Sequence, residues 1–340
     1  MVIVAVYQFM FWYTEPLQAV ADSHHKGYKL GQQLGDMTYS TLNLFFNFQL
    51  NYLTGQVLST VQASAKHFIQ NQLSRKQKYC VPGSVLLYYH VIALREGLHI
   101  LDAGRVDDIP TISDMAAALT SNVLGQFQGK VYSLIRAVHF RQSSGLLDIM
   151  NISDSIEEKK IQLRPIFALG IFHEGLMCFL SSMAANDSTK VTWISRGQSV
   201  LARIRCWHEH SSWNWENKML LLEAMLMHTL GNYDAAVLLC FSSIRSARAH
   251  KFIHEEAIAS ELAGDFLYEQ GHQIDSYALY MHSINCYIKW DALAVAMRVQ
   301  SIIESKFDSE NITVNVDEVM KRILGEAMDE PASNKRENLE

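Results

Sequence analysis

Residues 211–300 read SSWNWENKMLLLEAMLMHTLGNYDAAVLLCFSSIRSARAHKFIHEEAIASELAGDFLYEQGHQIDSYALYMHSINCYIKWDALAVAMRVQ, and this stretch decides the fold. The apolar side chains of residues 222–229 recur at the spacing of one helical face, and a second apolar stripe covers residues 233–247. Gly231 separates the two, and the same plan recurs around Gly271, forty positions later. Glycine turns at a fixed interval between amphipathic helices indicate a helical repeat, whose units bury their stripes by stacking on neighbours. The predicted fold class is all-α.

The N-terminal part of the chain shows the same plan. We expect helices over residues 16–35, 37–54 and 57–78. Val81-Pro82-Gly83 is interpreted as a break between units, after which Ser84 caps a helix that runs to Leu101.

The middle and the end of the chain are less regular. Residues 105–165 contain a loop, a short helix over residues 113–119, a helix over 122–143 and a polar stretch over 145–161, so a sub-boundary is placed here. A strongly apolar helix follows over residues 165–185. The repeat pattern stops after residue 305. Residues 306–340 are predicted to hold one short helix, at 316–324, and a charged disordered tail from 326 to 340.

Several segments resemble known families. GNYDAA, at residues 231–236, resembles the inter-helix turn of a tetratricopeptide repeat (TPR), although the forty-residue interval exceeds the usual length of about 34. SSWNWENKMLLLEAM (211–225), HEEAIASELAGDFLYEQG (254–271) with YIKWDALA (287–294), and FWYTEPLQAVADSHHKGYKLGQQLGD (11–36) are similar to the helical region of large predicted ATPases in multidomain signalling proteins, including hybrid histidine kinases. In that family the region follows an AAA-type ATPase module.

The resemblance covers residues 1–305, nearly the whole chain. It implies a right-handed, TPR-like α-solenoid and a regulatory role beside an ATPase. It carries no catalytic motif with it.

Composition narrows the classes of function. The net charge is −6 and the sequence pI is about 6.2, so no basic field favours nucleic acid. The five cysteines are widely spaced, which is typical of reduced buried thiols and predicts a cytoplasmic protein.

Two apolar segments require a membrane test. The run that begins at Met1 is too short to cross a bilayer and lacks a basic flank, and residues 165–185 carry His173-Glu174 at their centre. Both are interpreted as buried helices. Because Met1 falls inside a predicted helix, the chain is also expected to be part of a longer reading frame.

The sequence contains no complete catalytic motif of the common kinds. Gly125-Gln-Phe-Gln-Gly129-Lys130-Val131 is the nearest match to a phosphate-binding loop. It is one residue too short between its glycines, lacks the Ser or Thr that meets magnesium, and lies in a helical pattern. No Gly-x-Ser-x-Gly elbow, Cys-x-x-Cys pair or Gly-x-Gly-x-x-Gly turn is present. The chain is predicted to be non-catalytic, with no cofactor.

Histidine spacing offers the only metal hypothesis. His250 and His254 lie four positions apart, a spacing that places two ligands on one helical face, but a third ligand is missing. His208 and His210 would diverge at a helix end, and His24-His25 is a pair without a third ligand. No metal site is predicted from these pairs.

Aromatic side chains are the candidate contacts with a partner. Trp207, Trp213 and Trp215 lie at a repeat junction, and tryptophan is enriched in interface hot spots. Tyr277 and Tyr280 are further candidates. The alternative for all five is packing between helices.

The predicted function is that of an interaction or regulatory module without catalysis. Its partners would be proteins, an upstream ATPase module, or a second copy bound through an uncapped solenoid end, and not nucleic acid or membrane. Three alternatives stay open: a small-molecule sensor in which residues 105–165 line a pocket between two solenoid halves, a fragment without independent function, and a metal-dependent enzyme that uses His250 and His254.

Overall fold

The computed structural model describes residues 2–77, 80–142, 164–185, 187–307 and 314–325. Within these ranges the protein consists of α-helices and short 3-10 helices joined by turns, and contains no β-strand. The prediction of an all-α protein is confirmed. Residues 145–161 and 326–340, predicted to be a polar stretch and a disordered tail, lie outside the described residues.

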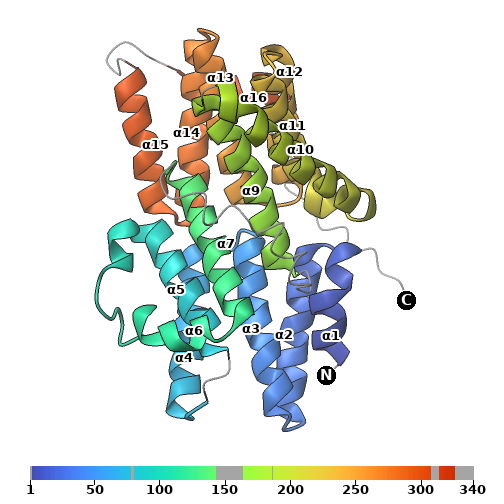
Figure 1. Ribbon diagram of the computed structural model, residues 1–340, viewed down its shortest axis with the longest axis vertical. Coiled ribbons are helices and arrows are strands. Elements are labelled where there is room, and N and C mark those ends of the chain that lie inside the picture. The colour runs from blue at the N-terminus through green and yellow to red at the C-terminus, as the bar shows by residue number, and fades with distance from the viewer. Residues whose placement is uncertain (1, 78–79, 143–163, 186, 308–313, 326–340) are drawn as a thin grey trace.

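The helices form a lower and an upper group with two helices between them (Figure 1). The lower group contains α1 (Val2–Phe9), α2 (Leu17–Gln33), α3 (Met37–Leu53), α4 (Leu58–Ser74), α5 (Val81–Glu96) and the short α6 (Ala116–Thr120). Between the groups run α7 (Val123–His139) and α9 (Pro165–Ala184). The upper group contains α10 (Asp187–His210), α11 (Ser212–Thr229), α12 (Tyr233–Ala249), α13 (Ile253–Glu269), α14 (Gln273–Trp290), α15 (Leu293–Lys306) and α16 (Val316–Leu324). Short 3-10 helices are η1 (Phe11–Tyr13), η2 (Leu98–Leu101) and η3 (Ser113–Met115).

One kind of turn closes the helices from α11 to α14. At Gly231, Lys251, Gly271 and Asp291 the backbone is left-handed, with φ of 82°, 62°, 81° and 72°. In each turn the next amide donates to the carbonyl five residues back, which is the long bond of a Schellman motif. The turns fall at twenty-residue intervals, so the helices between them have nearly equal lengths and consecutive helices pack side by side. We call α11 to α15 the repeats.

The central helix α9 is buried on nearly every side and packs on α3, α7, α10 and α11. Glycine permits this close contact: a Cβ atom at Gly170 would lie 2.7 Å from Val131 Cγ2, closer than real Cβ contacts allow. Among the described residues, α9 is also the one helix long and apolar enough to cross a membrane, and most of it is buried inside the protein.

The expected break at Val81-Pro82-Gly83 is wrong, because α5 begins at Val81 and carries the proline in its first turn. Proline is tolerated there since the first amides of a helix have no intrahelical partner. Ser84 does not cap the helix. Its hydroxyl donates to the carbonyl of Cys80 at 2.8 Å.

The end of the repeats returns to the lower group. Helix α15 packs on α5, and Asp291 in the turn before α15 accepts bonds from Arg95 Nε at 2.9 Å and from the amide of Ser59 at 3.1 Å. The end of the repeats is therefore in contact with α4 and α5 of the lower group, which the repeat pattern alone did not predict.

Candidate functional site

The repeats meet the helices below them along a polar contact that we call the seam. We define the seam by Asn214, Lys218, His254, Glu255, Glu261 and Arg298 of the repeats together with His139, Arg141 and His173 of α7, the turn after it and α9. At one end of the seam, the Asn214 side chain accepts from the amide of Leu17 at 3.0 Å and donates to the carbonyl of Glu15 at 2.8 Å. The side chain of Asn214, at the start of α11, is thus hydrogen-bonded to the backbone at the start of α2.

An ion pair lies buried next to this contact. Lys218 Nζ is 2.7 Å from Glu255 Oε2, with side-chain exposures of 2% and 1%. Lys218 also donates to the carbonyl of Asn214 at 2.8 Å and lies 4.1 Å from the centre of the Phe252 ring. Burial lowers the pKa of Lys218, and the carboxylate of Glu255 offsets only part of that lowering. Such a pair costs desolvation, and losing one partner would leave a buried charge uncompensated.

Three buried histidines come together beside the ion pair, one each from α7, α9 and α13. The His254 ring stacks on Trp290 with centroids 5.1 Å apart, His139 lies 5.5 Å from the same indole, and His139 lies 6.2 Å from His173. Burial lowers the pKa of His173 to about 4 and holds those of His139 and His254 well below their ordinary value. The imidazoles are therefore neutral at physiological pH.

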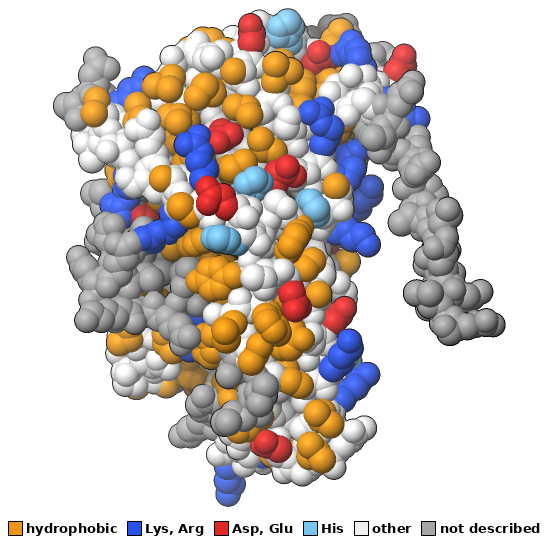
Figure 2. Space-filling view, turned by 90° about the vertical axis from the view of Figure 1, so that its right-hand side faces the viewer, with side chains coloured by type: hydrophobic (Ala, Val, Ile, Leu, Met, Phe, Trp, Pro, Cys, Tyr) orange, Lys and Arg blue, Asp and Glu red, His pale blue; other side chains and the backbone are white. Residues whose placement is uncertain are grey.

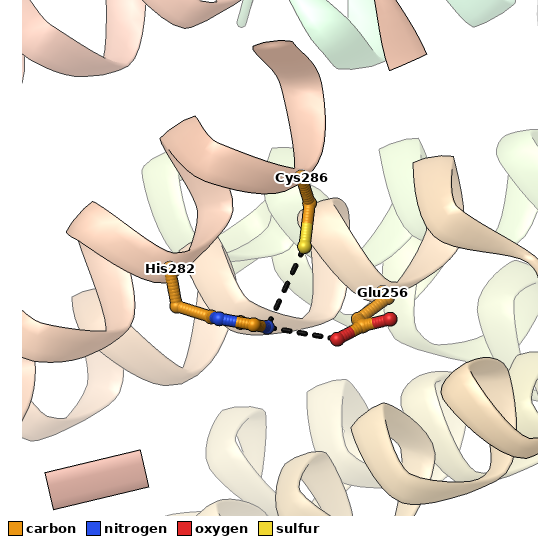
Figure 3. Close-up of side chains that lie close together, drawn as sticks. All are labelled: Glu256, His282 and Cys286. Atoms are coloured by element: carbon orange, nitrogen blue, oxygen red, sulfur yellow. Dashed lines mark hydrogen bonds and ion pairs between the residues drawn. The ribbon is translucent and has the colours of Figure 1, made fainter. Parts of the chain in front are cut away.

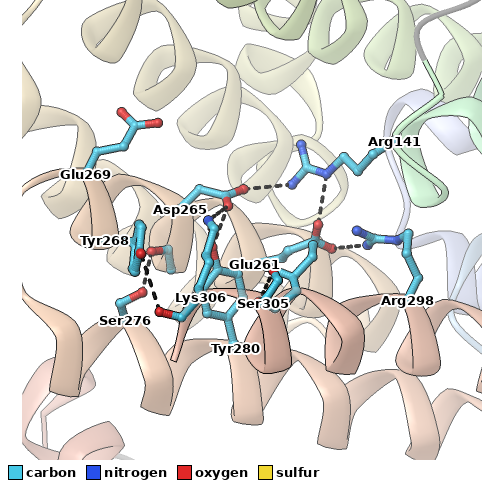
Figure 4. Close-up of polar contacts among 12 residues, drawn as sticks. Arg141, Glu261, Asp265, Tyr268, Glu269, Ser276, Tyr280, Arg298, Ser305 and Lys306 are labelled. Carbon is cyan, nitrogen blue, oxygen red and sulfur yellow. Dashed lines mark hydrogen bonds and ion pairs between the residues drawn. The ribbon is translucent and has the colours of Figure 1, made fainter. Parts of the chain in front are cut away.

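Charged side chains close the other end of the seam (Figure 4). Arg141, just after α7, donates to Glu261 at 2.8 Å and to Asp265 at 3.3 Å, and Arg298 of α15 donates to Glu261 at 2.6 Å. Lys306 is 3.0 Å from Asp265. Burial alone would raise the pKa of Glu261, but the two guanidinium groups hold it at about 2. This network connects the end of α7 to two helices of the repeats.

A histidine, a cysteine and a glutamate also come together within the repeats (Figure 3). His282 Nε2 lies 2.8 Å from Glu256 Oε1 and 3.4 Å from Cys286 Sγ. This cluster was not predicted from the sequence because Glu256 is on α13, whereas His282 and Cys286 are on α14. The available signal was the spacing of His282 and Cys286, one helical turn apart.

The geometry of this cluster does not suit a catalytic thiol. A catalytic base uses one ring nitrogen for the nucleophile and the other for the orienting carboxylate, whereas here both neighbours contact Nε2 of His282. Burial raises the pKa of Cys286 further, so the thiol stays protonated.

The ligand atoms of this cluster are close enough for a metal, but an arginine shares them. Arg248 Nη2 lies 2.6 Å from Glu256 Oε1 and 2.9 Å from His282 Nε2. A cation would have to displace this fixed guanidinium charge. The arrangement is a polar contact that joins α12, α13 and α14.

The aromatic residues predicted as partner contacts pack largely within the chain. Trp215 is buried against Trp207, with ring centroids 4.8 Å apart, and both lie near Trp12. Tyr280 is fully buried, and its hydroxyl donates to Asp265.

Three of these five aromatic residues keep part of their surface exposed. They are Trp207, Trp213 and Tyr277. The Tyr277 ring packs edge-on against Phe307, with centroids 5.6 Å apart. That Trp207, Trp213 and Tyr277 contact a partner stays a prediction, and the other two aromatic residues are too buried for it.

The proposed histidine pairs do not form common faces. His250 caps the end of α12 while His254 lies in α13, so the expectation that they share one helix is wrong. Lys251 makes the turn between them in a left-handed conformation, and no glycine signalled it. His24 is buried and bonded to Asn43 at 2.9 Å, whereas its neighbour His25 is exposed.

His208 and His210 both lie in the last turn of α10, where His208 is half-buried and His210 is exposed. The glycines that resemble a phosphate-binding loop lie inside α7. A loop that would wrap phosphate is therefore not formed there.

A cavity of ≈ 510 Å³ opens in the lower group. Residues 118–128 of the irregular middle line one side, together with Arg164. The remaining walls come from α1, α3 and the start of α5. The prediction that the middle of the chain lines a pocket thus holds in part, but this cavity lies between helices of the lower group and the starts of α7 and α9, and not between two solenoid halves.

Comparison of the chain with protein-family models, with curated proteins and with solved structures found no match. The fold and the seam define the class: an all-α protein in which consecutive helices pack on one another and the last of the repeats returns to the lower group.

Proposed function

We propose that this chain is a non-catalytic interaction and regulatory module of the cytoplasm, built as a right-handed, TPR-like superhelix that follows an AAA-type ATPase in a signalling protein. Three features support this proposal. The turns of the repeats recur at a constant interval, the buried charges described above are paired within the fold, and the resemblance covers residues 1–305.

The observation that carries the interaction role is the outer edge of the repeats at α15. Three large apolar side chains near this edge are exposed: Ile288 by 51%, Leu293 by 44% and Met297 by 71%. Each repeat buries its apolar stripe against the next, so the last helix presents a face on which a further helix can pack. We propose that a second copy of the chain or a neighbouring module binds there.

The regulatory step would pass through the seam. A partner on α15 contacts the same helix that carries Arg298, which joins Glu261 and, through it, Arg141 after α7. Binding that favours one arrangement of this network would shift the position of the repeats relative to the lower group and so bias an attached ATPase.

Self-association provides the direct test. Met297→Glu places a charge on the α15 edge, whereas Leu34→Glu places one at the end of α2, where the leucine is equally exposed at 73%. We expect sedimentation velocity to show concentration-dependent association that Met297→Glu weakens about tenfold and Leu34→Glu leaves unchanged. A chain that stays monomeric at every concentration, or an equal effect of both variants, would refute the role of this edge in self-association.

Catalysis and nucleic-acid binding are tested separately. The proposal expects no ATP turnover from the purified chain, and turnover abolished by a point substitution would contradict it. The face in Figure 2 carries basic and acidic side chains interspersed with hydrophobic ones, which supports an expectation of no nucleic-acid binding at that face.

A second candidate function, the sensing of a small molecule, is favoured by the cavity in the lower group. Its volume lies within the range of about 300–1,000 Å³ typical of ligand sites. A screen of metabolites by thermal melting tests it: a ligand that raises the melting temperature supports a sensor, and a uniformly negative screen counts against one.

A further inference from the structure

Three histidines occupy the contact between the repeats and the helices below them. His139 lies in α7, His173 in α9 and His254 in α13, and the exposed fraction of each side chain is 2% or less. The Trp290 ring packs against both His139 and His254, at centroid distances of 5.5 and 5.1 Å. A charge placed on any of these imidazoles therefore acts on the contact itself.

Hydrogen bonding fixes where a proton would bind on His173. Its Nδ1 lies 2.9 Å from the carbonyl oxygen of Leu169 and carries the hydrogen, because a carbonyl only accepts. Its Nε2 is thus the unprotonated nitrogen, and it has no hydrogen-bond partner among the described residues. Nε2 of His139 and both ring nitrogens of His254 are likewise without a hydrogen bond in the described part of the chain. The protein therefore offers these nitrogens no acceptor that would stabilise a protonated ring.

The carboxylates nearest the rings already have cationic partners. Oε2 of Glu255 lies 2.7 Å from Lys218 Nζ, and its Oε1 lies 3.6 Å from His254 Nε2, which is too long for a hydrogen bond. Glu261, at the other end of the seam, accepts from the two arginines shown in Figure 4. A protonated imidazole would thus add a positive charge to a buried region whose negative charges are matched.

The other titratable groups around the rings do not supply a further negative charge. The ring nitrogens of His90 lie 2.7 Å from the Tyr52 hydroxyl and 3.3 Å from Arg136, and burial raises the pKa of Tyr287, so its hydroxyl stays protonated beside His139. The contact of α9 with α10 holds an ion pair of its own at 2.6 Å. The groups that face the cluster are, by element, Tyr52 of α3, His90 of α5, Arg136 of α7, Arg141 after α7, Glu174 of α9, Arg196 of α10, Lys218 of α11, Glu255 and Glu261 of α13, Tyr287 of α14 and Arg298 of α15.

The closed seam favours neutral rings. Burial lowers the pKa of His173 to about 4 and holds those of His139 and His254 well below their ordinary value. An imidazole exposed to water has a pKa of about 6.5. Below that pH an open form binds more protons than the closed form, so acid stabilises the open form, whereas above it the closed form keeps its full stability. Because three rings share one contact, their contributions multiply.

We propose that the seam is a pH-sensitive switch, in which protonation of His139, His173 and His254 separates the repeats from the helices below them while each group of helices stays folded. Consecutive helices within each group pack on one another through apolar side chains, so that packing does not depend on the three rings. The inference goes beyond the proposed function, because the trigger is a proton and not a partner bound to α15.

One backbone amide reports directly on separation of the two groups. The amide of Leu17, in the first turn of α2, donates to the Asn214 side chain of α11 at 3.0 Å, so it loses this partner when the seam opens. Its exchange with deuterium, followed by NMR on the full chain and corrected for the intrinsic rate at each pH, gives the opening constant. Phe48, fully buried in α3, reports on unfolding of the lower group itself.

The opening constant at Leu17 is expected to rise about 300-fold from pH 6 to pH 5, because each of the three histidines contributes about sevenfold on exposure. At both pH values it should exceed the opening constant at Phe48, since the seam opens without unfolding of the lower group. Both amides are measured in the same sample.

Two variants remove one titrating ring each. His254→Phe keeps an aromatic ring against Trp290, and His173→Gln keeps a side-chain donor at the same position in α9. With either variant the rise at Leu17 should fall to about 50-fold, whatever the variant does to stability at neutral pH. Because the measured quantity is the ratio between two pH values, either variant that folds provides the test.

Two control variants keep all three rings of the seam. His272→Gln replaces an exposed histidine at the start of α14 and should leave the rise at Leu17 unchanged. His24→Gln removes a buried histidine of α2 outside the seam, so it should alter the acid response at Phe48 and not at Leu17.

Three results would overturn the inference. They are an opening constant at Leu17 that is the same at pH 6 and pH 5, a rise that neither His254→Phe nor His173→Gln reduces, and equal opening constants at Leu17 and Phe48, which would mean that the protein unfolds as a whole. The proposed function fails separately, because sedimentation of the Met297→Glu variant tests the α15 edge at constant pH.

Discussion

The repeats and the stretch between α5 and α7 connect their helices in different ways. In the repeats the helices α11 to α14 each end at a left-handed residue, from Gly231 to Asp291, and the next helix begins two residues later. The lower group also has left-handed residues after its helices at Gly35, Gly55 and Lys76, but the next helix begins two residues later only after Gly35. After Gly97 the chain makes two short 3-10 helices and one five-residue helix before α7 begins.

The difference explains where the protein has free volume. Equal helices with identical turns place each apolar stripe against its neighbour, so side chains fill the space between consecutive repeats. Residues 97–122 offer no helix long enough to cover α3 and the start of α5, and the cavity lies beside them. Regular turns thus build the stack, and the stretch without them borders the cavity.

The largest expected effect comes from breaking the seam that holds the two regions together. Glu255→Ala leaves Lys218 buried without its partner, so we expect a loss of about 3–5 kcal/mol in the free energy of unfolding, measured by urea titration. Glu304→Ala on the exposed face of α15 is the control and should change stability by less than about 0.5 kcal/mol. Equal midpoints for both variants would show that the seam contributes nothing.

Acid should weaken the lower group and the seam by a smaller amount. Burial lowers the pKa of both His24, in α2, and His173, in α9, to about 4, from 6.5 in the unfolded chain. Between those values the unfolded state binds more protons than the folded state, so stability is full above pH 6.5 and decreases as pH falls towards 4.

From pH 6.5 to 5 each of these histidines should therefore cost about 2 kcal/mol in the free energy of unfolding. His24→Gln should reduce the dependence on pH, while His25→Gln at the exposed neighbour should not. Unfolding free energies measured by urea titration at the two pH values provide the test, and a stability independent of pH over this range would refute it.

The smallest expected effect concerns the left-handed residue in the turns of the repeats. Lys251 has the same left-handed backbone as Gly231 but carries a Cβ atom, which costs about 1 kcal/mol. Lys251→Gly is expected to raise the free energy of unfolding by about 1 kcal/mol and Gly231→Ala to lower it by about the same amount. Calorimetry would show these changes as a higher and a lower melting temperature. The same direction of change in both variants would contradict equivalent turns.

Turns that contain a glycine were predicted from the sequence, and turns without one were not placed. The turns at Gly231 and Gly271 were predicted because glycine adopts positive φ without strain. Lys251 and Asp291 make the same turns without that signal, so the position of the turn between His250 and His254 was not predicted. Likewise, Pro82 suggested a break although it suits the first turn of α5.

The seam could not be predicted because its partners are far apart in sequence. Arg141 meets Glu261 across 120 residues, and Asn214 accepts from the amide of Leu17 across 197. Buried Lys218 and Glu255 read as ordinary surface charges in an amphipathic pattern. Only the packing of α7 and α9 against the repeats shows that they are interior.

The sequence by itself determined the all-α class, the positions of most helices and the regular spacing of the repeats, because these depend on local backbone preference and apolar periodicity. The tertiary structure alone decided that α15 returns to α5, that three histidines and an ion pair fill the seam, and that the cavity beside the irregular middle is walled by α1, α3 and the start of α5. These features depend on how equivalent helices stack in space, which no local pattern of residues specifies.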